Sequence, residues 1–129
     1  MRVANYRTVR IDVRENDTIY LVPEGDDIYN SDDMLSILAE MEKLSDGKRF
    51  KLLMLLGGTE FLMTKDARET FKANQIAKEL IIAEAVVMKS RSTTILYNLL
   101  TKLYAPPFPF KAFSSEKKAL LWLAEQQDR

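Results

Sequence analysis

The side chains that could do chemistry in this chain are restricted, because the sequence contains no histidine and no cysteine. Histidine is the usual general base near neutral pH and a common metal ligand, and cysteine supplies thiolate nucleophiles and zinc ligands. A Ser-His-Asp or Cys-His arrangement is therefore impossible within one chain. The remaining ionisable residues form no pattern that defines a reaction. The sequence thus predicts no catalytic residue, and any catalysis would depend on Asp, Glu, Lys, Arg, Tyr, Ser or Thr side chains.

The stretch from Lys51 to Glu69 is the best candidate for a functional site. It predicts a buried strand, a break at Gly57 and Gly58, a short loop and the start of a helix. In open α/β folds, ligands bind where such strands end, so we expect function near residues 57–66. The glycine pair could hold an anion, but the chain lacks a Walker motif and a GxGxxG motif after this strand. A turn after a strand explains the pair equally well.

A cluster of aspartates suggests a second kind of site. Asp26, Asp27, Asp32 and Asp33 could bind a hard cation through carboxylate oxygens. They lack the spacing of an EF-hand loop, and acids at a helix start are explained by the helix dipole. We therefore predict no metal site.

The elements that must position these residues alternate between strand and helix, in the order ββαβαβαβα. Strands are expected at 6–13, 18–22, 50–56, 84–88 and 108–113, and helices at 31–44, 64–80, 90–104 and from 114 or 115 onward. Alternation implies crossover connections and parallel pairing, while the first two strands form an antiparallel hairpin. We predict a single α/β domain over residues 1–129, with a single-layer, mixed, mainly parallel sheet of four to five strands and about four helices.

Helical spacing predicts which residues face inward. The first helix is expected to begin at an N-cap Ser31 and to carry the apolar stripe Met34, Leu35, Leu38 and Met41. The helix over 90–104 has an apolar face formed by Ile95, Leu96, Leu99, Leu100 and Leu103. Tyr97 and Tyr104 share another face, where they could line a groove or pocket or form an ordinary half-buried pair.

The charges balance in number but are separated along the chain. The 19 basic and 19 acidic residues give no net charge, so nucleic acid is not an expected partner. Residues 15–42 carry nine acids and no base, whereas residues 85–115 carry four bases and no acid. This separation could steer a partner or a second copy, or it could reflect solvated faces. The chain has no apolar run of about 18 residues and no signal-like start, so we expect a cytoplasmic protein without membrane insertion.

The element order and the C-terminal stretch FPFKAFSSEKKALLWLAEQ, residues 108–126, resemble the STAS superfamily. Its founding members are anti-sigma-factor antagonists of the SpoIIAA type, and the similarity is greater to the uncharacterised bacterial STAS-like (SpoIIAA-like) proteins. The resemblance implies a sheet with helices, no cofactor and a role in binding other proteins.

The resemblance also points to a switch position. That family carries a phosphorylated serine at the start of the helix after the central strand, in a context like F-x-D-S-S-G. The matching residues here read FLMTKD, residues 61–66, so Lys65 stands where the second serine would be and Thr64 is one residue early. The usual phosphoserine switch is therefore expected to be absent, and Thr64 is expected to act as an N-cap. The candidate partner or switch surface comprises Gly57, Gly58, Thr59, Met63, Thr64, Lys65, Asp66 and Arg68.

Three hypotheses for function remain open. The leading one is a non-enzymatic, regulatory module that binds another protein, or itself as a homodimer, through the surface near Gly57. The alternative is a binder of a small apolar or lipid-like ligand, since STAS-like folds are close to lipid-transfer domains of the SEC14 kind and six methionines could line an adaptable pocket. The third is an enzyme that uses a lysine or a carboxylate pair.

Overall fold

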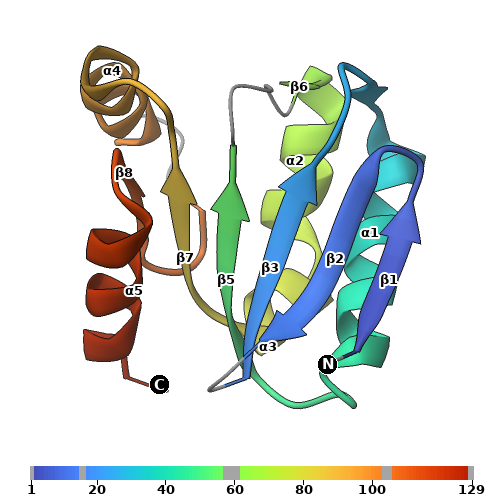
Figure 1. The fold of residues 1–129 in the computed structure, drawn as a ribbon. Coiled ribbons are helices and arrows are strands. Elements are labelled where there is room, and N and C mark those ends of the chain that lie inside the picture. Colours follow the sequence, from blue (N-terminus) through green and yellow to red (C-terminus); the bar gives the residue numbers. More distant parts are fainter. Residues whose placement is uncertain (1, 15–16, 57–61, 103–105, 128–129) are drawn as a thin grey trace.

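The computed structural model describes residues 2–14, 17–56, 62–102 and 106–127 (Figure 1). Six strands form one mixed sheet in the order β1-β2-β3-β5-β7-β8. Their bounds are β1 Val3–Tyr6, β2 Val9–Arg14, β3 Thr18–Pro23, β5 Phe50–Leu55, β7 Ile81–Val87 and β8 Phe110–Phe113. The first three strands are paired antiparallel, and β3, β5, β7 and β8 are paired parallel.

The sheet confirms the predicted α/β class and mixed pairing, but it contains six strands rather than four to five. The extra strand is β1, which pairs with β2 through a tight turn at Arg7, a residue with a φ of 52°. Its four residues are exposed or half-buried, so they carry little of the apolar alternation that identifies a strand in a sequence. The last strand, which was expected at 108–113, is β8, and it forms one edge of the sheet.

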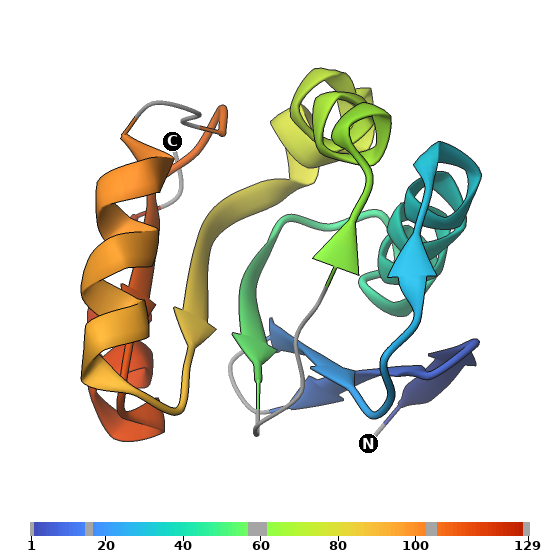
Figure 2. The same ribbon diagram turned by 90° about the horizontal axis from the view of Figure 1, so that it is seen from above.

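The described residues form five helices around the sheet: α1 Ser31–Leu44, α2 Lys65–Ala73, α3 Gln75–Leu80, α4 Arg91–Thr101 and α5 Glu116–Glu125. Seen from above, α1 and the α2–α3 pair lie side by side over one face of the sheet (Figure 2), while α4 packs against the edge strand β8. The opposite face packs against α5, where Ala119 and Leu123 are buried with Leu53, Ala83 and Ala85. The sheet is therefore buried on both faces, as expected for parallel strands joined by helices.

The single helix predicted over 64–80 is two helices. Asn74 has extended backbone angles, and its side-chain oxygen accepts a hydrogen bond from the Ile76 backbone N–H at 2.8 Å. An asparagine that caps the next helix in this way interrupts the first one. The strand that follows begins at Ile81, three residues before the predicted start at Glu84.

The start of α1 also differs from the prediction. Asn30, not Ser31, is the N-cap, and it forms a capping box with Asp33. Of the predicted stripe, Leu35 is 45% exposed and Ile37 is fully buried in its place. The end of the helix is as predicted, because Gly47 has a φ of 72°, a conformation that glycine adopts without strain.

A second, two-stranded parallel sheet pairs β4, Ile28–Tyr29, with β6, Leu62–Met63. Neither strand was predicted, because two residues are too few to produce a pattern. The pair joins the segment before α1 to the segment before α2, and the Thr64 N–H also donates to the Tyr29 carbonyl at 2.9 Å. The two helices are thereby held together at their N-terminal ends.

The apolar face predicted on α4 points to solvent. Ile95, Leu96 and Leu99 are 67%, 55% and 60% exposed. The side of α4 that packs on the molecule instead carries Thr94, Tyr97 and Asn98, and Asn98 exchanges two hydrogen bonds with the backbone of Ala112 on β8 at 2.7 and 2.9 Å. The Asn98 side chain therefore completes the hydrogen bonding of the edge strand at this residue. The side chain of Leu100 and the residues 103–105 lie outside the described part of the chain.

Within the described ranges, no helix is long and apolar enough to cross a bilayer.

Candidate functional site

A cavity of about 690 Å³ lies between the sheet and helices α1, α2 and α4. Its walls come from segments that are far apart in the sequence. The lining residues are Leu21, Met34, Ile37, Met41, Leu52, Met54, Met63, Lys65, Arg68, Glu69, Phe71, Lys72, Glu84, Tyr97, Pro106 and Phe110. Most are apolar, and four are methionines, whose flexible side chains adapt to ligands of different shape.

The sheet supplies the floor of this cavity. Leu52 and Glu84 are register partners on the neighbouring parallel strands β5 and β7, and Glu84 is in turn paired with Phe110 on β8. Residues that are paired across a sheet point to the same face. The three side chains therefore form a row across the floor, and the only charged residue in that row is Glu84.

Helix α2 supplies the charged wall of the cavity. Lys65, Arg68, Glu69 and Lys72 line it, and their spacing of i, i+3, i+4 and i+7 places them on one helix face. Lys65, Arg68 and Glu69 are exposed and Lys72 is half-buried, so this wall borders on solvent. The Arg68 guanidinium is fixed by a hydrogen bond from Nη1 to the Met63 carbonyl at 2.9 Å.

Glu84 is an unusual residue for the floor of an apolar cavity. Its side chain is 3% exposed, and its Oε1 atom makes no hydrogen bond with any described residue. Burial raises the pKa of the Glu84 carboxyl to about 8, because the charged form loses its hydration. At neutral pH Glu84 is therefore mainly a neutral carboxylic acid, which can both donate and accept a hydrogen bond.

Tyr97 of α4 lies on the opposite wall from α2. Burial, together with the negative charge on Glu84 when it ionises, raises the pKa of Tyr97 to about 12, while Arg68 acts in the other direction. The ring of Tyr97 stacks on that of Phe110 with centroids 5.8 Å apart. Tyr97 thus lines a pocket, which was one of the two interpretations open from the sequence; Tyr104 lies outside the described residues.

Chemically, the cavity combines an apolar interior, one neutral carboxyl on its floor and a charged rim. Pockets that bind small molecules have volumes of roughly 300–1,000 Å³, apolar walls and a few polar groups that orient the ligand. The cavity has these properties. A carboxyl with a raised pKa can also serve as a general acid or base, but such groups are usually oriented by hydrogen bonds, and Oε1 of Glu84 has none from the described residues.

The residues of the predicted partner or switch surface divide into three groups. Met63, Lys65 and Arg68 line the cavity. Thr64 and Asp66 form the start of α2 beside it. Gly57, Gly58 and Thr59 lie outside the described residues. The surface predicted from the sequence is therefore, in part, the rim of the cavity.

Thr64 has the role of N-cap that was expected from the sequence. Its Oγ1 accepts a hydrogen bond from the Ala67 N–H at 3.3 Å and donates one to Asp66 Oδ1 at 2.5 Å. This bond from Thr64 is the main cause of a lowered pKa at Asp66, with a smaller contribution in the same direction from Ser31. The Thr64 hydroxyl thus both accepts and donates a hydrogen bond within the first turn of α2.

Two of the four aspartates considered for metal binding are bound to protein groups. Asp33 accepts hydrogen bonds from Tyr6 at 2.6 Å and Arg7 at 2.9 Å, and Asp27 accepts one from Thr8 at 2.8 Å. Burial opposes ionisation of Asp33, but these hydrogen bonds and that from the Asn30 N–H lower its pKa overall. Among the described residues, no group of three or more Asp or Glu side chains could hold a metal ion.

Glu84 was not predicted as a site residue. In the sequence it only interrupts the apolar run of residues 80–88. A glutamate inside a strand that is otherwise apolar and therefore buried on both faces is itself a signal, because such residues are almost never buried without a partner. That signal could have identified the residue, but not the cavity around it.

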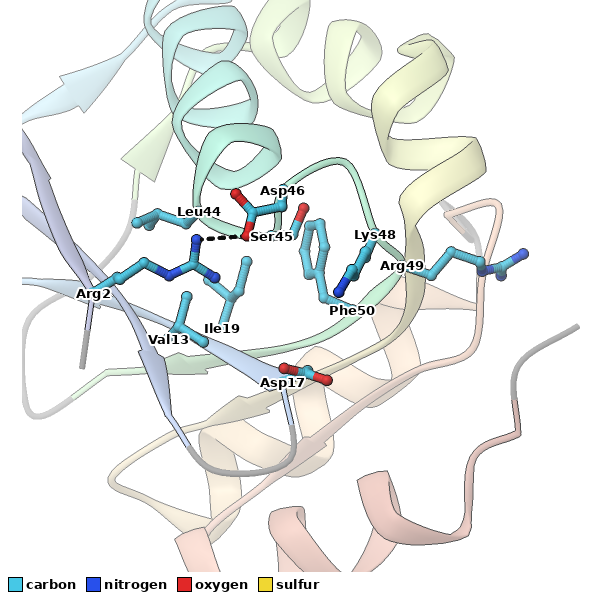
Figure 3. Close-up of a pocket in the computed structure, with 10 residues that line it drawn as sticks. All are labelled: Arg2, Val13, Asp17, Ile19, Leu44, Ser45, Asp46, Lys48, Arg49 and Phe50. Atoms are coloured by element: carbon cyan, nitrogen blue, oxygen red, sulfur yellow. Dashed lines mark hydrogen bonds and ion pairs between the residues drawn. The ribbon is translucent and has the colours of Figure 1, made fainter.

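A second pocket, at the opposite end of β5, is much smaller (Figure 3). It has a volume of about 50 Å³ and is bordered by the ion pair between Arg2 and Asp46, whose Nη1 and Oδ2 atoms lie 3.0 Å apart. Pockets that bind small molecules have volumes of roughly 300–1,000 Å³, so this pocket is too small for such a ligand.

Comparisons with known proteins agree with this fold. No curated protein matches the sequence. The structure is similar to that of an uncharacterized protein of the DUF3478 family with a SpoIIAA-like fold from Shewanella loihica PV-4, with 18% identity, a TM-score of 0.58, and coverage of 93% of this chain and 97% of that chain. This likeness shows the fold alone, and it confirms the STAS-like resemblance. A family model for a domain of unknown function, DUF7793, matches residues 13–127, and the chain therefore belongs to the DUF7793 family.

Proposed function

We propose that this protein is a non-catalytic, STAS-like binding module that holds a small apolar ligand in the cavity between the sheet and helices α1, α2 and α4. The observation that carries this proposal is the cavity of about 690 Å³, whose walls include Met34, Met41, Met54 and Met63. A fold stabilised only by close packing contains few voids larger than a water molecule. A space of this size in so small a protein is best explained by a ligand.

Binding is favoured over catalysis for three reasons. The sequence lacks histidine and cysteine, and the one buried carboxyl in the cavity, Glu84, has no orienting hydrogen bond to Oε1 from the described residues. The side chains on the rim, Lys65 and Arg68, are exposed and therefore lack the desolvation that makes a lysine a nucleophile.

The regulatory part of the proposal concerns the start of α2. The STAS resemblance implies that this turn contacts partners, and here the same turn forms the rim of the cavity through Met63, Lys65 and Arg68. A ligand that contacts these residues would change the surface that a partner meets. The module would then respond to a bound ligand in place of a phosphoserine.

The binding proposal is tested by titrating the protein with the fluorescent apolar probe 1-aminoanthracene and measuring the affinity of the probe. We expect saturable binding to the wild-type chain and a loss of about tenfold or more in affinity in Met54→Trp, because the indole would occupy the cavity. Leu121→Trp is the matched control, since Leu121 is 59% exposed on α5 and lies outside the cavity. Equal binding by both variants, with circular dichroism showing both folded, would contradict the proposal.

Self-association is a second candidate, favoured by two exposed stripes. The exposed Ile95, Leu96 and Leu99 of α4 are accompanied by two exposed bases, Arg91 at the start of the helix and Lys102 directly after its end. This is the segment without acids, so a complementary surface would be apolar with acidic groups around it.

The chain itself carries such a surface on α1. Leu35 is exposed there between the exposed acids Asp32 and Glu42, at positions i, i+3 and i+10 of one helix face. Helices α1 and α4 lie at opposite sides of the molecule in both views (Figures 1 and 2). We therefore propose a head-to-tail contact between α4 of one copy and α1 of the next, which is a heterologous interface.

Light scattering at two salt concentrations tests this contact. We expect concentration-dependent oligomers at about 20 mM salt that weaken at about 500 mM, because screening removes the charge attraction. Leu99→Glu should be monomeric at both, whereas Leu121→Glu, a leucine of similar exposure on α5, should behave like the wild type. A monomeric wild-type protein at low salt would exclude this candidate.

A further inference from the structure

The floor of the cavity contains a hydrogen-bonding group that the described residues leave without a partner. Glu84 lies in the middle of β7, with all seven residues of that strand buried. Its side chain lines the cavity, and its Oε1 is buried without a hydrogen-bond donor within the described ranges. A buried polar atom without a partner is costly, so it requires an explanation such as a catalytic role or a bound water, ion or ligand.

The charged and polar groups around the cavity do not fill this role. From α2 the cavity is faced by Lys65, Arg68, Glu69 and Lys72, and from α4 by Tyr97. No hydrogen bond or ion pair joins Glu84 to any of these five described side chains. The hydrogen bond that Arg68 Nη1 makes is directed to the Met63 carbonyl. The donor that Oε1 lacks would have to come from a molecule inside the cavity.

We propose that Glu84 selects the ligand: the cavity takes an apolar molecule that carries a neutral O–H or N–H donor, such as a long-chain alcohol or amide, and that group bonds to the Glu84 carboxyl. This inference rests on the proposed binding function and names its ligand class. A plain hydrocarbon or an ether would leave Oε1 without a donor. A hydroxyl can donate to Oε1 and also accept from the protonated carboxyl.

A neutral donor fits the site better than a cation. Burial keeps the Glu84 carboxyl mainly protonated at pH 7, since its pKa is raised to about 8. A cationic amine would need this carboxyl to ionise in an apolar environment. It would also have to pass the α2 rim, where the bases Lys65, Arg68 and Lys72 outnumber the acid Glu69.

The test compares two isomers of equal composition, 1-undecanol and 1-methoxydecane, by displacement of 1-aminoanthracene at about pH 7. Both have the same apolar size, but only the alcohol can donate a hydrogen bond. We expect the wild-type chain to prefer the alcohol by about tenfold, the effect of one hydrogen bond that also satisfies a buried acceptor. Aminoundecane, the cationic analogue, should bind more weakly than the alcohol.

Variants at Glu84 test whether the preference for the alcohol over the ether depends on the Glu84 carboxyl. Glu84→Gln keeps a donor and an acceptor and should retain the preference for the alcohol. Glu84→Met has a similar volume without a hydrogen-bonding group and should reduce the preference to about twofold or less. Glu125→Met is the matched control, because it removes an exposed glutamate from the end of α5, outside the cavity, and it should behave like the wild type.

The outcomes separate this inference from the proposed function. If neither isomer nor aminoundecane displaces the probe, the proposed binding function fails as well. Equal binding of the two isomers by the wild-type chain would overturn the role of Glu84 and leave apolar binding intact. A preference for the alcohol that persists in Glu84→Met, or tighter binding of the amine, would also overturn it. The isomer comparison needs only the wild-type chain, so it remains decisive if a variant fails to fold.

Discussion

The two faces of the sheet are built differently, although both are buried. On the face covered by α5, β7 presents Ala83 and Ala85, and the helix presents Ala119 and Leu123, all 2% exposed or less. Alanines on both sides let a helix approach a sheet closely, so this face is filled. On the other face, β7 presents Glu84 to a cavity of about 690 Å³.

Polar groups on the two faces differ in the same way. On the α5 face, Tyr20 donates a hydrogen bond from its hydroxyl to Glu116 Oε2 at 3.0 Å, which connects β3 to the first residue of α5. On the cavity face, Oε1 of Glu84 has no partner among the described residues. Buried polar groups in a fold are normally paired. Among the described residues, the cavity face therefore lacks a hydrogen-bond donor for Glu84 Oε1, whereas the Tyr20 hydroxyl on the α5 face has a partner.

The cavity stays open because the helices around it are attached at its borders. Helix α1 is bound to the β1–β2 turn through Asp33 and Arg7, and α2 is bound to α1 by a 2.9 Å hydrogen bond between the hydroxyls of Ser31 and Thr70. Helix α4 is bound to the edge strand through Asn98. These hydrogen bonds hold α1, α2 and α4 in place at the borders of the cavity. The helices therefore need not pack against one another across the cavity itself. The α5 face is therefore filled, whereas the face covered by α1 and α2 combines the larger buried core with the cavity.

The largest expected effect is a pH dependence of stability due to Glu84. Its pKa is raised from 4.5 to about 8, so between these values the folded chain holds a proton that the unfolded chain has released. The contribution to stability is full below about pH 4.5 and is lost as the pH rises toward 8, by about 1.4 kcal/mol per pH unit. Urea unfolding of the wild type and of Glu84→Gln at several pH values measures this.

This window is free of the usual competing group, because the chain has no histidine. Asp33, whose pKa is lowered, titrates at more acidic pH, and Tyr97 and Tyr20, raised to about 12, titrate at more alkaline pH. We expect the Glu84→Gln curve to be nearly flat between about pH 5 and 8. Parallel curves for the two chains would show that the Glu84 carboxyl is not desolvated as the structure indicates.

The next effect compares matched truncations on the two faces. Leu123→Ala, in the filled face, should reduce the free energy of unfolding by about 2–5 kcal/mol, because it leaves a void between α5 and the sheet. Met54→Ala, in the cavity wall, should cost about 2 kcal/mol or less, since the methionine has packing partners on fewer sides. Chemical denaturation of both variants measures the difference. Equal costs would mean that the cavity face is packed as tightly as the α5 face.

A smaller effect concerns the attachment of α4. Asn98→Ala removes both hydrogen bonds to the buried Ala112 on β8 and should cost about 1–3 kcal/mol. It should also weaken 1-aminoanthracene binding, because Tyr97 on the same helix lines the cavity. Ser92→Ala, at an exposed position of α4, is the control for both readouts. If Asn98→Ala is destabilised but binds the probe as tightly as the wild type, the position of α4 does not affect binding in the cavity.

Features with a local cause were predictable from the sequence. The apolar run after Lys51 predicted a buried strand, and β5 is one. The last helix was predicted to start from 114 or 115 onward, and α5 begins directly after its N-cap Ser115, whose Oγ accepts from the Lys118 N–H. The N-cap Thr64 is another such case. Each depends on side chains within a few residues of one another.

Features that depend on tertiary contacts were not predictable. The apolar stripe of Ile95 and Leu99 indicated the inner face of a helix, but Asn98 turns another face toward β8. The cavity floor combines Leu52, Glu84 and Phe110 from three strands, and no sequence pattern places them together. The start of α2 was identified as a candidate site from its place after a buried strand and from the STAS resemblance, whereas its position at the rim of a cavity emerged only from the fold.

The most direct test of the central claim uses the methionine methyl groups as reporters. Met34, Met41, Met54 and Met63 line the cavity, whereas Trp122 packs on the α5 face. We predict that titration with 1-undecanol shifts the carbon-13 methyl NMR signals of these four methionines in a saturable manner and leaves the Trp122 indole N–H signal unchanged. Methyl signals that do not move up to the solubility limit of the alcohol, or a shift confined to Trp122, would contradict the account.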